Sequence, residues 1–102
     1  MPLLTVIVPA FNEEKTIKDI VGKINAVDID KEIIVIDNGS QDETGRILRS
    51  IQLPNLTIIH HVTNRGKGGA VLTGLSKATG RYAIIQDADL EYDPNDYGKL
   101  LQ

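Results

Sequence analysis

The sequence predicts an α/β fold in three layers, αβα, with a Rossmann-like and mostly parallel sheet. Four short apolar runs rich in β-branched residues recur along the chain, at residues 3–8, 31–36, 56–62 and 82–85. Helical periods separate these runs, and a polar loop follows each of them. Alternation of strands and helices with short loops implies right-handed crossovers, so we expect parallel strands with helices on both faces of the sheet.

The four runs fit buried strands because they are almost continuously apolar, as strands covered on both faces are. Residues 3–8 read LLTVIV and are closed by Pro9, and residues 31–36 read KEIIVI. The third run, LTIIHHV, contains His60 and His61. Alternation places one histidine on each face of the sheet, where we expect structural roles.

Three segments between the runs have the spacing of a helix with one apolar face. The predicted inward positions are Ile17, Ile20, Val21 and Ile24, then Ile47, Leu48 and Ile51, then Val71, Leu75 and Ala78. Asp93 followed by Pro94 predicts the start of a further helix. We expect the strand order 3-2-1-4, which leaves residues 82–85 as an open edge of the sheet.

The chain of 102 residues is long enough for one compact domain, which we assign to residues 1–102. Its hydrophobic content of 41% and charged content of 25% are ordinary for a globular protein, and its net charge of −3 argues against nucleic-acid binding. The absence of cysteine excludes disulfides and suits the cytoplasm. No apolar stretch reaches the roughly 20 residues of a membrane span, and the start lacks a signal-peptide pattern. Because the sequence stops just after a helix begins, we expect a truncated C-terminus.

Polar loops follow all four predicted strands: PAFNEE at residues 9–14, DNGSQD at 37–42, NRGKGG at 64–69 and DAD at 87–89. In a parallel sheet these loops lie along one edge, outside the carboxyl ends of the strands, where ligands bind. Each loop alone has an ordinary explanation, such as capping of the second helix by Asp42 or Ser40. The convergence of four such loops predicts a functional site.

The fourth loop carries three acids at alternate positions, Asp87, Asp89 and Glu91. Along an extended segment these carboxylates point the same way, and they repel each other unless a cation joins them. Mg²⁺ and Mn²⁺ prefer carboxylate and phosphate oxygens. The segment therefore predicts a divalent metal held against a phosphate; general acid–base chemistry and a solvated acidic loop are the alternatives.

The third loop places glycines and two cations at the start of a predicted helix. Residues 66–69 read GKGG, and Arg65 and Lys67 are basic. Exposed backbone N–H groups, the helix dipole and the two cations suit a diphosphate, whereas the alternative is a flexible surface turn. The spacing from GKG to Asp87 also resembles a dinucleotide-binding fingerprint, but Val71 occupies its third small-residue position.

Four motifs in order, VIVPAFNEE, VIDNGSQDET, NRGKGGAVLTG and IIQDADLEYDP, resemble the nucleotide-sugar-binding half of the family 2 inverting glycosyltransferases, which have the GT-A fold. The chain looks most like the branch that contains dolichyl-phosphate and polyprenyl-phosphate mannosyl- and glucosyltransferases. The resemblance implies metal-dependent, inverting transfer of a hexose from a UDP- or GDP-linked sugar to a polyprenyl-phosphate or saccharide acceptor. It also implies that the full-length protein works at the cytoplasmic face of a membrane.

The resemblance further implies roles for individual residues. The nucleotide-binding set is Pro9, Ala10 and Glu13 around the nucleoside, Asp37 as acceptor from the base, Arg65 and Lys67 near the ribose or diphosphate, and Asp87. Asp87 and Asp89 form the D-x-D motif and are the implied catalytic residues. Asp89 binds Mn²⁺ or Mg²⁺, and Glu91 stands where this branch often has a glutamine metal ligand.

The chain also departs from the family pattern. Asn38 replaces an aspartate often found in this loop, a change that bears on discrimination of the base or ribose. We expect the acceptor region and any catalytic base to lie in sequence beyond this chain. Two alternatives follow: a nucleotide- and metal-binding fragment that transfers nothing, and a nucleotidyltransferase-like domain, which would need a glycine-rich loop where this chain has PAFNEE. The open sheet edge predicts homo-oligomers.

Overall fold

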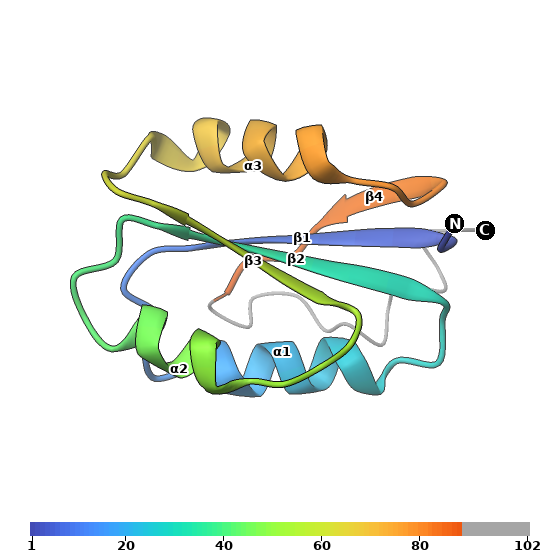
Figure 1. Ribbon diagram of the computed structural model, residues 1–102, viewed down its shortest axis with the longest axis horizontal. Coiled ribbons are helices and arrows are strands. Elements are labelled where there is room, and N and C mark those ends of the chain that lie inside the picture. Colours follow the sequence, from blue (N-terminus) through green and yellow to red (C-terminus); the bar gives the residue numbers. More distant parts are fainter. Residues whose placement is uncertain (89–102) are drawn as a thin grey trace.

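The computed structural model describes residues 1–88 and confirms the predicted three-layer αβα fold (Figure 1). In chain order its elements are β1 (Leu4–Ala10), α1 (Ile17–Ala26), β2 (Lys31–Asn38), α2 (Thr44–Ser50), β3 (Leu56–His61), α3 (Gly66–Lys77) and β4 (Tyr82–Ile85). The strands form one parallel sheet in the order β3-β2-β1-β4, as predicted. Helices α1 and α2 cover one face and α3 covers the other (Figure 1). Within residues 1–88, no helix is long and apolar enough to cross a membrane.

The two central strands extend beyond the apolar runs that predict them. Strand β1 continues through Pro9 and Ala10, and β2 continues through Asp37 and Asn38. The parallel ladder still pairs Ala10 with Asp37, and it pairs Asn38 with His61 of β3. Residues predicted to lie in loops therefore occupy the rigid carboxyl ends of strands.

Alternate side chains of the central strands face two hydrophobic clusters. The larger cluster, beneath α1 and α2, includes Val6, Val8, Ile33, Val35, Ile20 and Leu48. The smaller cluster, beneath α3, contains Ile7, Ile34, Ile36 and Ala70. The predicted inward faces of the first two helices are confirmed, since Ile17, Ile20, Val21, Ile24 and Leu48 are buried and Ile47 and Ile51 pack against the larger cluster.

The predicted inward face of the third helix is only partly confirmed, because Val71 and Ala78 are half-buried but Leu75 is exposed. Helix α3 buries Ala70 and Gly74, one position before the predicted Val71 and Leu75, and Leu75 is 47% exposed. A Cβ built on Gly74 would lie only 2.6 Å from Ile7 Cγ2. Small residues thus bring this helix close to β1, and the bulkier Leu72 and Leu75 are exposed.

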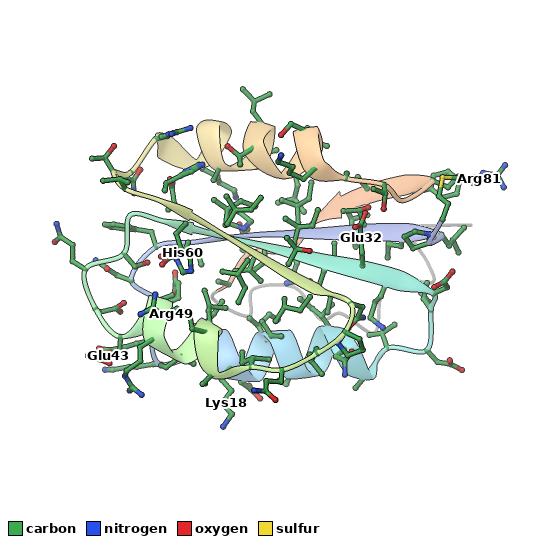
Figure 2. The ribbon with its side chains drawn as sticks, in the orientation of Figure 1. Lys18, Glu32, Glu43, Arg49, His60 and Arg81 are labelled. Carbon is green, nitrogen blue, oxygen red and sulfur yellow. The ribbon has the colours of Figure 1, made fainter. Side chains whose placement is uncertain are left out.

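Glu32 accepts hydrogen bonds from the segment that connects α3 to β4. It lies at the end of the sheet opposite His60 (Figure 2). Its Oε2 accepts hydrogen bonds from Thr5 Oγ1 at 2.6 Å, Thr79 N at 2.5 Å, Thr79 Oγ1 at 2.7 Å and Gly80 N at 3.1 Å. Burial opposes ionisation of this carboxyl, but the hydrogen bonds outweigh it and lower the pKa of Glu32. These four hydrogen bonds fix where β4 begins and therefore where its carboxyl end lies.

Strand β4 forms an edge that leads us to expect self-association. Among residues 1–88 it pairs only with β1, and Tyr82 and Ile85 are each 47% exposed. Unpaired backbone groups next to exposed apolar side chains favour pairing with a second chain. Sedimentation velocity should therefore show a concentration-dependent dimer that Ile85→Lys weakens. Val62→Lys, at a residue that directly follows β3 and is 97% exposed, is the control and should leave the dimer unchanged. A monomer at all concentrations would contradict this expectation.

Candidate functional site

The carboxyl ends of the strands enclose a cavity of about 300 Å³. Its described lining consists of Pro9, Ala10, Phe11, Glu13, Asn38, Asn64, Lys67, Asp87 and Ala88. These residues come from all four predicted polar loops, so the predicted convergence of the loops at one edge is confirmed.

The cavity brings together part of the predicted nucleotide-binding set. Pro9, Ala10, Glu13, Lys67 and Asp87 line it. By contrast, Asp37 and Arg65 are not among its described lining residues. The predicted metal ligands Asp89 and Glu91, and the helix start predicted at Asp93, lie outside the described residues.

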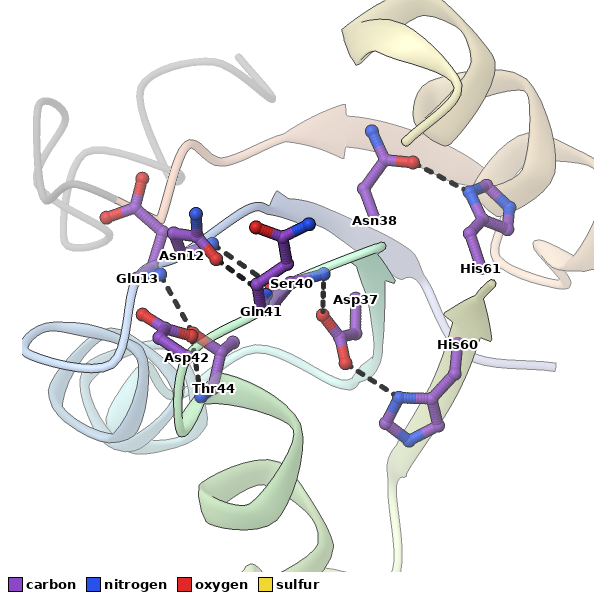
Figure 3. Close-up of polar contacts among 10 residues, drawn as sticks. All are labelled: Asn12, Glu13, Asp37, Asn38, Ser40, Gln41, Asp42, Thr44, His60 and His61. Carbon is purple, nitrogen blue, oxygen red and sulfur yellow. Dashed lines mark hydrogen bonds and ion pairs between the residues drawn. The ribbon is translucent and has the colours of Figure 1, made fainter. Parts of the chain in front are cut away.

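Backbone-to-side-chain hydrogen bonds join the loops after β1 and β2 (Figure 3). Asn12 N donates to Ser40 Oγ at 3.0 Å, and Gln41 N donates to Asn12 Oδ1 at 2.8 Å. Glu13 N donates to Thr44 Oγ1 at 2.8 Å. Asn12 has a φ of 52°, a left-handed conformation that asparagine tolerates better than most residues. The two loops therefore form one unit beneath the cavity.

Asp42 lies one residue before Glu43, the N-cap residue of α2, which itself makes no side-chain capping bond. Asp42 accepts hydrogen bonds from Thr44 N at 2.9 Å, Thr44 Oγ1 at 2.5 Å and Glu14 N at 3.2 Å. Burial opposes ionisation of Asp42, but these hydrogen bonds outweigh it and lower the pKa of Asp42. Ser40, the other predicted cap, instead accepts from Asn12 N.

Asp37 is turned toward β3 and α2. Its Oδ2 lies 2.8 Å from His60 Nδ1, and its Oδ1 accepts from Ser40 N at 3.3 Å (Figure 3). A Cβ on Gly45 would lie 2.8 Å from the same Oδ2, so α2 packs directly against the carboxylate. Asp37 is only 6% exposed, and its predicted contact with a base remains a prediction.

Asn38 and His61 occupy the opposite face of the sheet from Asp37 and His60 (Figure 3). His61 Nδ1 lies 2.8 Å from Asn38 Oδ1, and His61 Nε2 lies 2.9 Å from Thr73 Oγ1 of α3. The predicted placement of the two histidines on opposite faces is thereby confirmed. Both histidines contact polar side chains, in agreement with structural roles.

The buried position of His61 makes stability depend on pH. Burial, followed by the charge of Arg65, lowers the pKa of His61 below its ordinary value of 6.5. The unfolded chain takes up this proton near the ordinary value and the folded chain only at lower pH, so the free energy of unfolding falls as pH drops below about 6.5. Urea unfolding at about pH 7.5 and about pH 5.5 should show a lower midpoint in acid. His61→Gln should reduce this difference; an unchanged difference would contradict the assignment to His61.

Lys67 and Asp87 form an ion pair across the cavity, with Nζ 2.7 Å from Oδ1. Lys67 lies in the first turn of α3, and Asp87 follows β4. The preceding residue is held to β1 by a bond from Gln86 N to Ile7 O at 2.8 Å. The site thus presents a cation, the amino end of a helix and a carboxylate to one space, a combination that suits an anionic ligand with an accompanying cation.

Carboxylate oxygens at the cavity come from Glu13 and Asp87, hard donors of the kind that Mg²⁺ and Mn²⁺ prefer. No group of three or more histidine, cysteine or acidic side chains among residues 1–88 could hold a metal ion. Glu13 and Asp87 therefore supply two hard oxygen donors at the cavity, and within residues 1–88 they belong to no larger metal-ligating cluster.

Four lining residues were not predicted as site residues: Phe11, Asn38, Asn64 and Ala88. Phe11 could have been predicted from the sequence, because it is an aromatic residue in an otherwise polar loop. In the structure its side chain is 43% exposed. Asn38 and Asn64 gave weaker signals, because an asparagine after a strand is common in turns.

The fold and the cavity define a Rossmann-like α/β domain with a cavity lined by charged side chains at the carboxyl edge of its sheet. The chain belongs to the family described as Glycosyl transferase family 2, whose model matches residues 5–102. This match confirms the family predicted from the four motifs.

Named relatives agree with the family. The chain is 34% identical over 117 residues to a UDP-N-acetylglucosamine--dolichyl-phosphate N-acetylglucosaminyltransferase of Methanococcus voltae, covering 98% of this chain and 46% of the relative. It matches a structure of the mannosyltransferase PcManGT from Pyrobaculum calidifontis in complex with GDP-Man and Mn²⁺ at a TM-score of 0.83 and 34% identity, covering 93% of this chain and 30% of that one. A structure of S. aureus TarS 1-349 in complex with UDP matches at a TM-score of 0.83 and 27% identity, covering 96% and 30%. The chain therefore spans less than half the length of each of these proteins.

Proposed function

We propose that this chain is the donor-binding part of a glycosyltransferase and that its cavity holds a nucleoside-diphosphate sugar together with a divalent cation. The observation that carries the proposal is the Lys67–Asp87 pair, 2.7 Å apart, across a cavity that Pro9, Ala10 and Glu13 also line. Two similar structures contain GDP-Man with Mn²⁺ and UDP, which supports this class of ligand.

Within this proposal, the residues singled out in the four sequence motifs divide the ligand between them. Pro9, Ala10 and Glu13 contact the nucleoside, Asp37 accepts from the base, and Arg65 and Lys67 lie near the ribose or diphosphate. Asp87, Asp89 and Glu91 hold Mn²⁺ or Mg²⁺ against the phosphates. The chemistry that this cation supplies when bound is neutralisation of the charge on the departing diphosphate.

The chain's own residues would serve transfer by binding and orienting the donor. Lys67 and the amino end of α3 stabilise negative charge on the leaving group. Attack by the acceptor from the opposite face of the sugar inverts the anomeric carbon. A lipid-phosphate acceptor, the kind named in the M. voltae relative, is ionised near neutral pH and needs no strong protein base, whereas a sugar hydroxyl needs one.

Calorimetric titration of the chain with UDP and with GDP, each with Mn²⁺ and then with EDTA, tests the proposal. Binding that depends on the metal is expected for one of the two, and that one identifies the base. Absence of binding in every condition would overturn the proposal.

A second candidate is a module that binds donor and metal but does not transfer the sugar. Turnover of a donor sugar separates the two candidates. The family match favours sugar transfer over nucleotidyl transfer, the other alternative that the sequence left open.

A further inference from the structure

We propose that Asn38 is a positioning residue: its side-chain amide fixes the loop of residues 64–66 and so sets the place of Lys67 in the cavity, without contacting the ligand. The inference rests on the proposed function, because it concerns the same cavity. It assigns Asn38 a role different from the base or ribose contact that its position in the motif suggests.

The amide of Asn38 has no hydrogen-bonding capacity left for a ligand. Its Oδ1 accepts from His61 Nδ1 at 2.8 Å and from Arg65 N at 3.0 Å. Its Nδ2 donates to Gly66 O at 3.0 Å and to Asn64 Oδ1 at 3.3 Å. A primary amide offers two donors and two acceptor positions, so the protein itself occupies all four.

An amide makes two more hydrogen bonds than a carboxylate could at this position of the chain, because its Nδ2 donates to Gly66 O and Asn64 Oδ1. Arg65 N can only donate and Gly66 O can only accept, so these two backbone groups also fix which end of the Asn38 amide faces each of them. Aspartate would keep the acceptor for Arg65 N but would place negative charge against Gly66 O. Asn38, which departs from the family pattern, therefore offers an acceptor to Arg65 N and a donor to Gly66 O.

The loop held by Asn38 leads directly into the cation of the site. Gly66 opens α3 with a φ of 75°, and Lys67, the next residue, pairs with Asp87. Gly39, the residue after Asn38, packs closely against the same loop, since a Cβ on Gly39 would lie 2.5 Å from Asn64 N. The end of β2 thus determines where α3 starts and where Lys67 stands.

A double-mutant cycle on nucleotide binding separates positioning from direct contact. Asn38→Ala, Lys67→Ala and the double variant are titrated with UDP or GDP, whichever the parent chain binds, in Mn²⁺. We expect Asn38→Ala to weaken binding about ten-fold, and the double variant to bind no more weakly than Lys67→Ala alone. Losses that add would mean that Asn38 acts independently of Lys67 and would overturn the inference. Lys77→Ala, at the other end of α3, is the matched control and should not change the effect of Asn38→Ala.

Amide hydrogen exchange provides a readout without ligand. Asn38→Ala should speed exchange at Arg65 N by about ten-fold or more while leaving central strand β1 protected, because the amide oxygen that Arg65 N bonds is gone. Unchanged exchange at Arg65 would overturn the inference. If Asn38→Ala fails to fold, Asn38→Ser, which is too short to span the loop, takes its place in both experiments.

The two proposals fail in different ways. A parent chain that binds neither UDP nor GDP refutes the proposed function, and with it the ligand part of the inference. A parent chain that binds, combined with additive losses or unchanged exchange at Arg65, refutes the role of Asn38 alone.

Discussion

Asp87→Asn is expected to weaken binding of the nucleoside diphosphate in Mn²⁺ by about 100-fold, the change that loss of roughly 2.7 kcal/mol produces. Asparagine has the same shape, so the substitution removes the charge but not the volume. Asp87 lies at the cavity with its carboxylate 2.7 Å from Lys67 Nζ and 22% of its side chain exposed. The expected loss comes from the contact of the carboxylate to a cation that the phosphates share. Calorimetric titration measures it.

The effect of Asp87→Asn on nucleotide binding should disappear when the metal is removed, which distinguishes this prediction from a general loss of structure. In EDTA the carboxylate of Asp87 can only repel a diphosphate, so Asp87→Asn should then bind no more weakly than the parent chain. Asp19→Asn, on an exposed residue of α1 that pairs with Lys23, is the matched control and should bind like the parent chain. Equal binding by Asp87→Asn and the parent chain in Mn²⁺ would show that Asp87 is not a ligand-site residue.

Gly74→Ala is expected to lower the free energy of unfolding by about 1–3 kcal/mol, whereas Gly22→Ala should raise it by about 0.5–1 kcal/mol. Both residues lie inside helices, so both substitutions gain the same helix propensity. A Cβ on Gly74 would lie 2.6 Å from Ile7 Cγ2 and 3.1 Å from Ile36 Cδ1, both in the buried sheet. A Cβ on Gly22 would meet nothing within 4 Å. Urea unfolding of the two variants isolates the cost of moving α3 away from the sheet.

A stabilising Gly74→Ala would show that α3 is not packed against β1 at the distance described. Because α3 carries Lys67 in its first turn, its displacement should also weaken nucleotide binding. Gly22→Ala should leave binding unchanged, since Gly22 lies on α1 and does not line the cavity.

The positions of the strands and the first two helix faces were predictable because bulky apolar residues mark them. Ile20 and Ile24, for example, are large and apolar, and both are buried in α1. The face of α3 was not predictable by the same rule, because there the close contact is made by Ala70 and Gly74. A helical pattern based on bulky residues predicts Val71 and Leu75 as the inward positions. The helix lies so close to the sheet that only the small Ala70 and Gly74 fit at the contact.

At the site, topology predicted which loops meet but not which side chains face the cavity. Asp37 and Asn38 are neighbours at the end of β2, so their side chains point to opposite faces of the sheet. Asp37 meets His60 beneath α2, and Asn38 meets His61 beneath α3. Alternation alone indicates this separation once β2 is known to continue through both residues. The apolar run from which the strand was predicted ends at Ile36, before them.

The most direct test of the account is to map nucleotide binding by ¹⁵N NMR, with UDP or GDP and Mg²⁺ added to the chain. The account predicts that shift changes centre on Phe11, Lys67 and Asp87, around the cavity at the carboxyl edge of the sheet. A second groove of about 250 Å³ between α1 and α2, next to Gly22 and Ser50, serves as an internal control and should not respond. Changes centred on that groove, with none at Lys67 or Asp87, would contradict the claim that the carboxyl-edge cavity is the donor site.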